Sequence, residues 1–213
     1  MEYLWKASAV LGICYFSYKL FLERDTFFSS IRIYLLTGIL LSFVVPLIEI
    51  TRYVKSEVIA IPYGQWVSDS VAVSESSSWD PTNILIGAYA LGVLLFLGRF
   101  LVQLSSLLWL LYRQPYKSEG KYRILPTSKN LAPFSFFNHI VYPHNRFNEK
   151  ELEQVIAHEK AHADGYHSVD ILLVQLLCIV QWFNPVAWLY ARDIRKNLEY
   201  IADEGLCQQE HQT

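Results

Sequence analysis

Long apolar runs constrain the fold of this chain more than any other feature. The chain has 213 residues, of which 53% are hydrophobic, and three apolar runs cover about residues 4–22, 31–50 and 84–111. About 20 consecutive apolar residues are needed for a helix to cross a bilayer, so each run is predicted to be a transmembrane helix. These runs predict a mainly α membrane protein, and the formal net charge of −2 gives no indication of direct binding to nucleic acid.

The distribution of basic residues predicts the orientation in the membrane. Segment 51–81 carries two basic residues against four acidic ones, whereas the segment after the third run is rich in lysine and arginine. By the positive-inside rule, the N-terminus and loop 51–81 are expected outside the cell. The chain is therefore predicted to have a transmembrane region, residues 1–112, and a cytoplasmic domain, residues 113–213.

The sequence H-E-x-x-H begins at His158 and ends at His162. Residues four apart on a helix lie on one face, so both imidazoles can point at one metal ion. Glu159 is then placed to accept a proton from a metal-bound water without being a ligand. This pattern predicts a catalytic zinc site with Glu159 as the general base. The alternative, for the motif by itself, is an exposed helix face with two surface histidines.

The motif lies in a segment with the features of a helix start. Asn148 is a plausible N-cap, Glu151 stands three residues later as its capping-box partner, and acidic residues fill the first turn. The sequence therefore predicts a helix over about residues 149–163 that carries both histidines.

A fourth apolar run, residues 168–191, is predicted to be a helical hairpin that faces the membrane. Asn184-Pro185 breaks any helix near the middle of the run, and each half is too short to span a bilayer. A hairpin also keeps Glu199 on the same side as the histidines, where it can be the third zinc ligand. Asp203, four residues later on the same helix face, can hydrogen-bond a ligating imidazole.

Two short β-like runs, residues 122–125 and 135–142, precede the motif helix and predict a small sheet. The fold class is thus three transmembrane helices followed by an α+β, zincin-like domain. An exposed edge strand could hold a peptide substrate in extended form beside the metal. The alternative is a hairpin that serves packing alone, and the sequence does not decide between them.

These segments together resemble a known family. The motif at His158, the run His167-Ser168-Val169-Asp170, the run Trp182-Phe183-Asn184-Pro185 and the pair Glu199 and Asp203 are similar to the BlaR/MecR-type bacterial membrane metallopeptidases. That family is gluzincin-like and distantly similar to the Ste24/HtpX proteases.

The resemblance implies a role for each residue that matches the motifs. It implies His158, His162 and Glu199 as zinc ligands, Glu159 as the catalytic base and Asp203 as a residue that supports a ligand. His167 and Asp170 are additional candidate site residues, without an assigned role.

The resemblance also implies a cellular role. Members of the family sense an external signal in the bacterial inner membrane and cleave a cytoplasmic protein, often a transcriptional repressor. The expected partners are thus a protein substrate, membrane lipid and a candidate second copy of the chain, but no nucleic acid. In that family, sensing of beta-lactams requires a separate penicillin-binding domain, which these 213 residues do not contain. Either the sequence is an N-terminal portion of a longer receptor or this member lacks the sensor, so an antibiotic signal is not carried over.

A second functional class remains open from the sequence. A non-enzymatic receptor or scaffold could use zinc as a structural ion, although Glu159 favours the enzyme because a structural site needs no base. An oxyanion-stabilising group is not identified by the sequence, and four residues are candidates by proximity alone: Tyr166, His167, Arg192 and Arg195.

Overall fold

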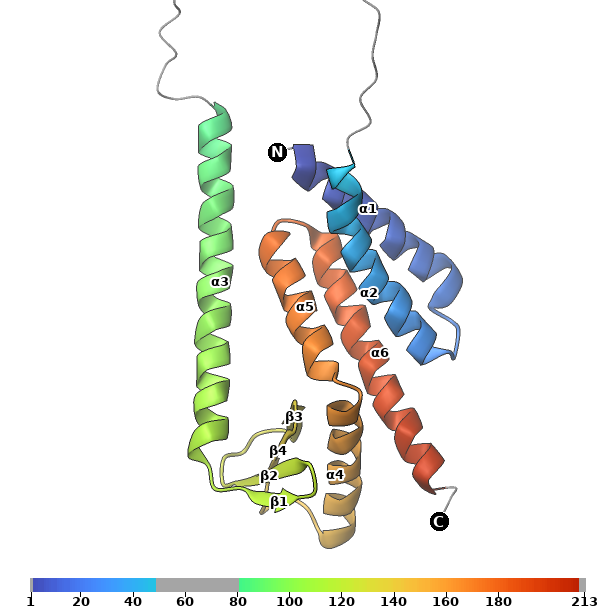
Figure 1. The fold of residues 1–213 in the computed structure, drawn as a ribbon, viewed down its shortest axis with the longest axis vertical. Helices are drawn as coiled ribbons and strands as arrows, with labels where there is room; N and C mark the ends of the chain where they lie inside the picture. Colours follow the sequence, from blue (N-terminus) through green and yellow to red (C-terminus); the bar gives the residue numbers. More distant parts are fainter. Residues whose placement is uncertain (1, 49–80, 211–213) are drawn as a thin grey trace, which may run out of the picture.

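The computed structural model describes residues 2–48 and 81–210, with side chains as far as residue 207 (Figure 1). The predicted extracellular loop 51–81 lies outside the described residues except for Pro81. The first part of the chain is helical, as the apolar runs predict. Its elements are α1 (Glu2–Ser17), the π-helical turn η1 (Tyr18–Leu22), α2 (Phe28–Val44), the 3₁₀ turn η2 (Val45–Leu47) and α3 (Pro81–Arg113).

A four-stranded sheet follows α3. Its strands are β1 (Lys117–Glu119), β2 (Tyr122–Thr127), β3 (Phe134–Phe136) and β4 (His139–Pro143), in the order β1-β2-β4-β3. β2 and β4 pair in parallel, and both outer strands are antiparallel to their neighbours. The single β-like run predicted over 135–142 is wrong in one detail. Phe137 has a positive φ of 49°, and the chain turns there between β3 and β4.

Three helices complete the chain: α4 (Glu149–Asp164), α5 (His167–Val180) and α6 (Pro185–Glu210). The predicted capping box at the start of α4 is confirmed. The backbone N–H of Glu151 donates to Asn148 Oδ1 at 2.9 Å, and the backbone N–H of Asn148 donates to Glu151 Oε2 at 3.0 Å. Both hydrogen bonds satisfy N–H groups that have no partner inside the helix.

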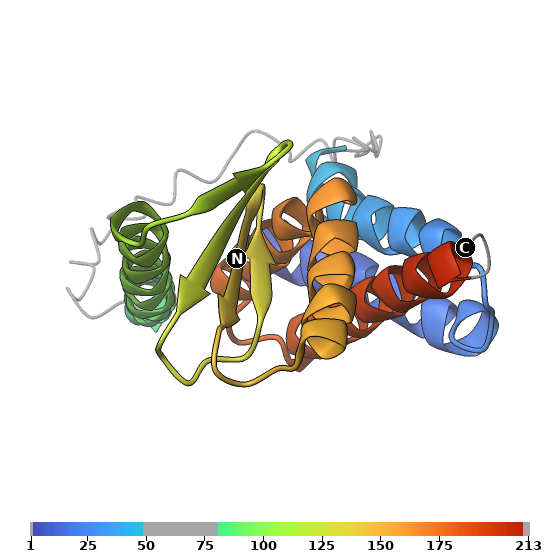
Figure 2. The same ribbon diagram turned by 90° about the horizontal axis from the view of Figure 1, so that it is seen from below.

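The sheet lies between α3 and α4 (Figure 2). Leu111 at the end of α3 packs in one buried cluster with Leu125 of β2 and Val141 of β4. On the other side, β3 and β4 contact α4. The sheet therefore connects the end of the long helix α3 to the helix that carries the H-E-x-x-H motif.

Helices α5 and α6 form the predicted antiparallel hairpin. They extend beside α1 and α2, and their turn lies at the end of the molecule away from the sheet (Figure 1). The four helices share one buried core, which includes Leu11, Leu35, Val174 and Tyr190. The hairpin belongs to the second predicted domain but packs directly on α1 and α2 of the first. The division of the chain into two domains at residue 112 stays a prediction.

Polar side chains close the turn of the hairpin. Asn184 Nδ2 donates to Gln181 Oε1 at 2.7 Å, and Asn184 Oδ1 accepts from the backbone N–H of Val186 at 2.9 Å. The hydroxyl of Ser8 in α1 donates a second hydrogen bond to Gln181 Oε1, at 3.3 Å. Gln181 is fully buried, and these bonds give its side-chain oxygen two partners in place of water, while its Nε2 has none among the described residues.

Two helical segments in the described part of the chain are long and apolar enough to cross a membrane by themselves, Phe28–Leu47 and Pro81–Arg113. They correspond to the second and third predicted spans. The first predicted span, over 4–22, stays a prediction. Helices α4 and α5 are long and apolar enough for a crossing only when they are taken together, and they are bent by 64° relative to each other. The charged residues of α4 make a crossing at that point costly.

The packing of α2 on α6 leads to a first prediction. A Cβ atom at Gly38 would lie 2.2 Å from the hydroxyl of Tyr190, which is fully buried and donates to the Leu35 carbonyl at 2.8 Å. Gly38→Ala should therefore destabilise the protein by about 1–3 kcal/mol, the usual cost of overpacking. Thermal unfolding in detergent measures this. Gly12→Ala is the matched control because its Cβ would meet nothing within 4 Å, and an equal effect of both variants would contradict the packing argument.

Candidate metal centre

The two motif histidines lie on one face of α4, and their Nε2 atoms are 3.1 Å apart. This proximity follows from their spacing, because residues four apart lie about one helical turn from each other. Burial lowers the pKa of His162, and the neutral imidazole is the form that binds a metal. The pair therefore offers two nitrogen lone pairs at one point.

Glu199 brings a third donor atom to the same point from α6. Its Oε2 lies 3.4 Å from His158 Nε2 and 3.7 Å from His162 Nε2. Donor atoms bound to a tetrahedral zinc ion at 2.0–2.1 Å are about 3.3 Å apart, so the three observed separations fit such an ion. Within the described residues, these three side chains form a group that could hold a metal.

The remaining ring nitrogens of the histidines have partners of their own. Asp203 Oδ1 lies 3.2 Å from His158 Nδ1, and His167 Nδ1 lies 2.7 Å from His162 Nδ1. Such partners fix which nitrogen carries the proton and hold the ring in its orientation. Asp203 thus lies where the sequence predicts a supporting residue.

His167 lies behind His162, away from the open side of the site. It is 1% exposed, and burial, with smaller effects of His162 and Arg32, lowers its pKa to about 4. A neutral His167 can accept a hydrogen bond from the Nδ1–H of His162, which leaves Nε2 of His162 free for a metal. This position does not suit an oxyanion donor, which was one role considered for His167.

Glu159 points into a cavity of about 380 Å³ beside the three donor atoms. Pro133, Phe134, Ser135, Val155, His158, His162, Ile171 and Glu199 line the rest of it. Glu159 is 7% exposed, and this burial raises the pKa of its carboxyl, while a hydrogen bond with Ser135 and the charge of His158 oppose the rise. A carboxylate with a raised pKa is a stronger base than an exposed one.

Strand β3 lines part of this cavity and is one of the two outer strands of the sheet. It pairs with β4 on one side, and in the described chain no strand pairs with its other side. Residues of this edge strand and the three candidate ligands therefore line the same cavity.

The other oxyanion candidates are not brought to this cavity. Tyr166 is 63% exposed with its φ at 53°, and it marks the corner between α4 and α5. Arg192 contacts Asp193 at 3.4 Å, and neither Arg192 nor Arg195 lines the cavity. Although both arginines are close to Glu199 in sequence, they do not reach the cavity, because they extend from exposed positions of α6.

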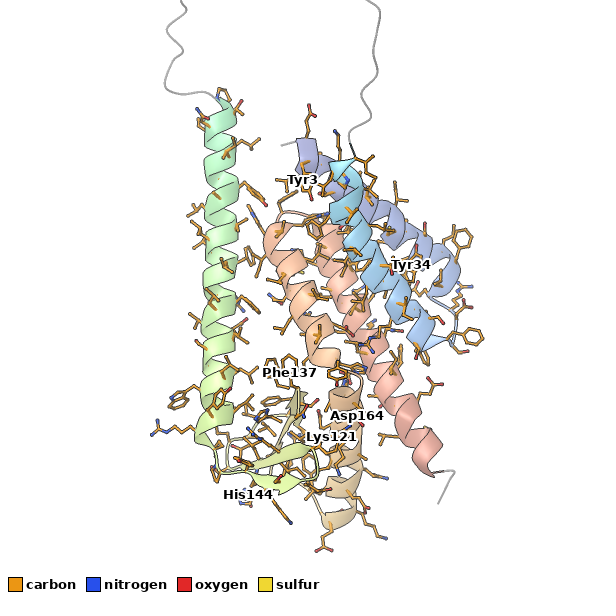
Figure 3. All side chains as sticks on the ribbon, in the orientation of Figure 1. Tyr3, Tyr34, Lys121, Phe137, His144 and Asp164 are labelled. Atoms are coloured by element: carbon orange, nitrogen blue, oxygen red, sulfur yellow. The ribbon has the colours of Figure 1, made fainter. Side chains whose placement is uncertain are left out.

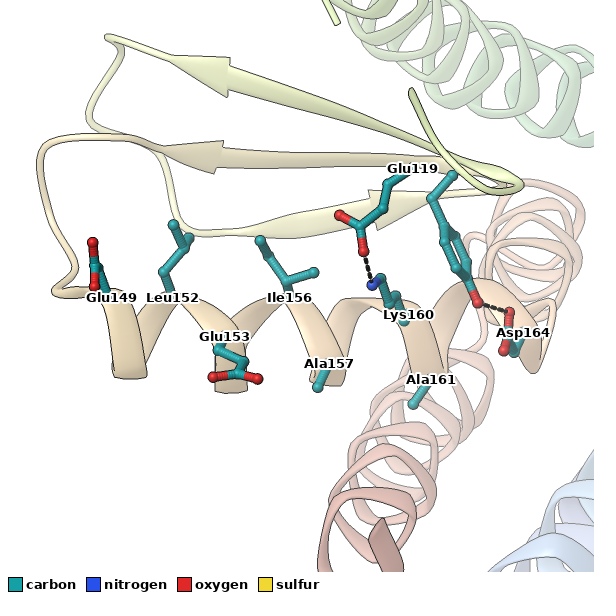
Figure 4. Close-up of a pocket in the computed structure, with 10 residues that line it drawn as sticks. Glu119, Glu149, Leu152, Glu153, Ile156, Ala157, Lys160, Ala161 and Asp164 are labelled. Atoms are coloured by element: carbon teal, nitrogen blue, oxygen red, sulfur yellow. Dashed lines mark hydrogen bonds and ion pairs between the residues drawn. The ribbon is translucent and has the colours of Figure 1, made fainter. Parts of the chain in front are cut away.

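A second cavity, of about 520 Å³, lies where α4 faces the β1–β2 hairpin (Figure 4). Lys160 pairs with Glu119 at 2.6 Å, and the Tyr122 hydroxyl donates to Asp164 at 2.7 Å. Lys121 adds an ion pair with Asp164 at 2.7 Å (Figure 3). Neither the histidines nor Glu159 line this cavity, so it is not the metal site, and its contacts hold the β1–β2 hairpin against α4.

Two residues near the site were not identified from the sequence. Ser135 gave no signal, because a serine in a strand is ordinary. Arg32 lies inside the second apolar run, where a charged side chain often marks a functional site, but the sequence does not show its partner. In the structure it lies in α2 and pairs with the candidate residue Asp170, which is 3% exposed. Asp170 does not line the cavity and has a role in packing the helices.

Comparison with known proteins gives one family. Residues 134–213 match the model of the BlaR1 peptidase M56 family. The matched segment contains β3, α4, α5 and α6, and therefore all three candidate ligands and Glu159. No curated protein matches the chain.

The geometry predicts different effects on zinc binding for different residues. His158→Ala and Glu199→Ala each remove one of three donor atoms and should lose stoichiometric zinc. Asp203→Ala should keep zinc with an affinity about 10–100-fold weaker, the usual effect of removing a residue that supports a ligand. Metal analysis of the purified protein and titration with a chelator measure both effects. His139→Gln, in β4, is the control and should match the native chain; native zinc affinity in His158→Ala would contradict the assignment.

Proposed function

We propose that this chain, whose residues 134–213 belong to the BlaR1 peptidase M56 family, is a membrane-embedded zinc endopeptidase that cleaves a protein substrate on the cytoplasmic side. The observation that carries the proposal is the meeting of three donor atoms, a buried carboxylate and a free strand edge at one cavity. Each of these parts has a separate use in peptide hydrolysis.

His158, His162 and Glu199 would hold the zinc ion, with one position left open. A bound zinc ion supplies Lewis-acid polarisation of a carbonyl and lowers the pKa of the water it binds. Asp203 and His167 keep the two imidazoles in the orientation in which Nε2 carries the lone pair.

Glu159 would act as the general base and then as the general acid. Its carboxylate takes a proton from the attacking water, and its burial favours the protonated form that results. The same proton can then pass to the departing amine. The hydrogen bond with Ser135 of β3 holds the carboxyl group toward the cavity.

The free edge of β3 would bind the substrate in extended form. Backbone N–H and C=O groups of an edge strand can pair with a peptide and so give affinity without regard to sequence. Because β3 lines the cavity that contains Glu159, a peptide paired with β3 would pass beside the donor atoms.

The cytoplasmic location and the signalling role are also part of the proposal. The positive-inside rule supports the location, since basic residues follow α3. The family supports a signalling role in the bacterial inner membrane, with a transcriptional repressor as the substrate, membrane lipid around α2 and α3, and a second copy of the chain as a candidate partner. A receptor or scaffold with a structural zinc ion is favoured less, because an open cavity and a buried base adjoin the ligands.

Replacement of Glu159 tests the function directly. Glu159→Gln removes the base but no ligand, so zinc content should equal that of the native chain while cleavage falls about 10²–10⁴-fold, the usual contribution of such a group. The measurement compares new N-terminal peptides in cells that express the native chain or the variant. Glu153→Gln is the matched control, since Glu153 is an exposed residue of α4 away from the histidines. Equal cleavage by native chain and Glu159→Gln would overturn the proposal.

A further inference from the structure

Arg32 of α2 reaches the corner between α4 and α5, directly after the motif helix. Its Nη2 donates to the Gly165 carbonyl at 2.7 Å, and its Nε lies 2.7 Å from Asp170 Oδ2 as an ion pair. The Asp170 side chain is 4% exposed and the Arg32 side chain 24%. One guanidinium thus connects a candidate membrane span to two points on the corner.

The corner leaves little room for movement. The N–H of Gly165 donates to the Ala161 carbonyl at 2.9 Å, and Tyr166 takes a left-handed conformation with φ at 53°. A Cβ at Gly165 would lie 2.5 Å from His167 Nε2, so the His167 ring packs directly against the backbone of Gly165. A displacement of Gly165 would therefore displace the ring of His167.

His167 in turn contacts His162, a candidate metal ligand. Its Nδ1 lies 2.7 Å from Nδ1 of His162, and the two rings are 4.8 Å apart at an angle of 79°. The adjacent Ser168 accepts a hydrogen bond from the backbone N–H of Phe137 at 2.9 Å, at the turn between β3 and β4. The corner that Arg32 holds is thus in contact with both a ligand and the turn after the edge strand.

We propose that Arg32 is a positioning residue that holds His162 in its metal-binding orientation through Gly165 and His167, so that the metal affinity of the site depends on the position of α2. The proposal rests on the proposed function, because it takes His162 as a ligand. The fork of donors on arginine suits this task, since it can bind a carbonyl and a carboxylate at once. Lysine carries the same charge on a single nitrogen and cannot reproduce that geometry.

The matched control is a second buried ion pair between the N-terminal helices and the C-terminal ones. Lys19 lies 2.9 Å from Asp193, whose side chain is 3% exposed, and this pair connects η1 to α6. Asp193 is in contact with Tyr15 and Arg192 but with none of the candidate ligands. Lys19→Gln therefore removes this pair, together with the exposed ion pair of Lys19 with Glu23, without touching the corner.

The experiment measures zinc affinity by chelator competition and the visible spectrum of bound Co²⁺, both on the purified full chain in detergent. Arg32→Gln is expected to weaken zinc binding about 10–100-fold and to change the Co²⁺ spectrum, as loss of a residue behind a ligand does. Lys19→Gln is expected to lower the unfolding temperature while affinity and spectrum stay native. Native affinity and spectrum in Arg32→Gln, or equal losses in both variants, would overturn the proposal.

Two further variants test the route. Arg32→Lys should weaken zinc binding less than Arg32→Gln but in the same direction, and it covers the case in which the glutamine variant fails to fold. His167→Gln should weaken binding, and the double variant with Arg32→Gln should weaken it no further, because both act on one ligand. Additive losses would overturn the route through His167.

The proposed function is tested apart from this inference. If the native chain binds zinc and Arg32→Gln binds it weakly, but neither cleaves any protein, then the protease assignment fails and the role of Arg32 stands. If cleavage depends on Glu159 and zinc affinity does not depend on Arg32, the protease assignment stands and the role of Arg32 fails.

Discussion

The structure depends on one requirement, that donor atoms from α4 and α6 meet within a few ångströms. The histidines achieve half of this through helical spacing alone, but Glu199 belongs to a helix that starts at the far end of the molecule. α5 leads the chain away from the site and α6 returns it, so the hairpin and its packing on α1 and α2 determine the position of the carboxylate. Burial lowers the pKa of His162 and of His167, the histidine behind it, and so favours the neutral form of both rings.

The two sides of this site differ in character. Behind the imidazoles, His167 and Asp203 hold both rings, and the corner at Gly165 is closely packed. In front of them lies the cavity with Glu159 and the free edge of β3. Under the proposed function this arrangement would keep the ligands fixed while a substrate enters and leaves. The β1–β2 hairpin adds rigidity from a third direction, through ion pairs with Lys160 and Asp164 on α4.

The sequence was informative where local rules determine structure. The N-cap at Asn148, the facing histidines and the hairpin around Asn184-Pro185 follow from helix geometry and from proline, and they agree with the structure. The break at Phe137 was not predictable, because a positive φ at phenylalanine has no pattern in sequence. The contacts of Ser135 and Arg32 depend on segments far apart in the chain, which no periodicity reveals. Composition alone also did not reveal that α1 ends after 16 residues, at the π-helical turn that follows it.

The buried turn of the hairpin has a consequence for the order of assembly. Gln181 Oε1 accepts a hydrogen bond from the hydroxyl of Ser8, a residue near the beginning of the chain. Synthesis proceeds from the N-terminus, so α1 and α2 exist before the hairpin is made. The hairpin can therefore assemble on helices that are already present, and α1 serves as a template inside the same molecule. The three donor atoms can meet only after α6 has been made, because Glu199 lies on that helix.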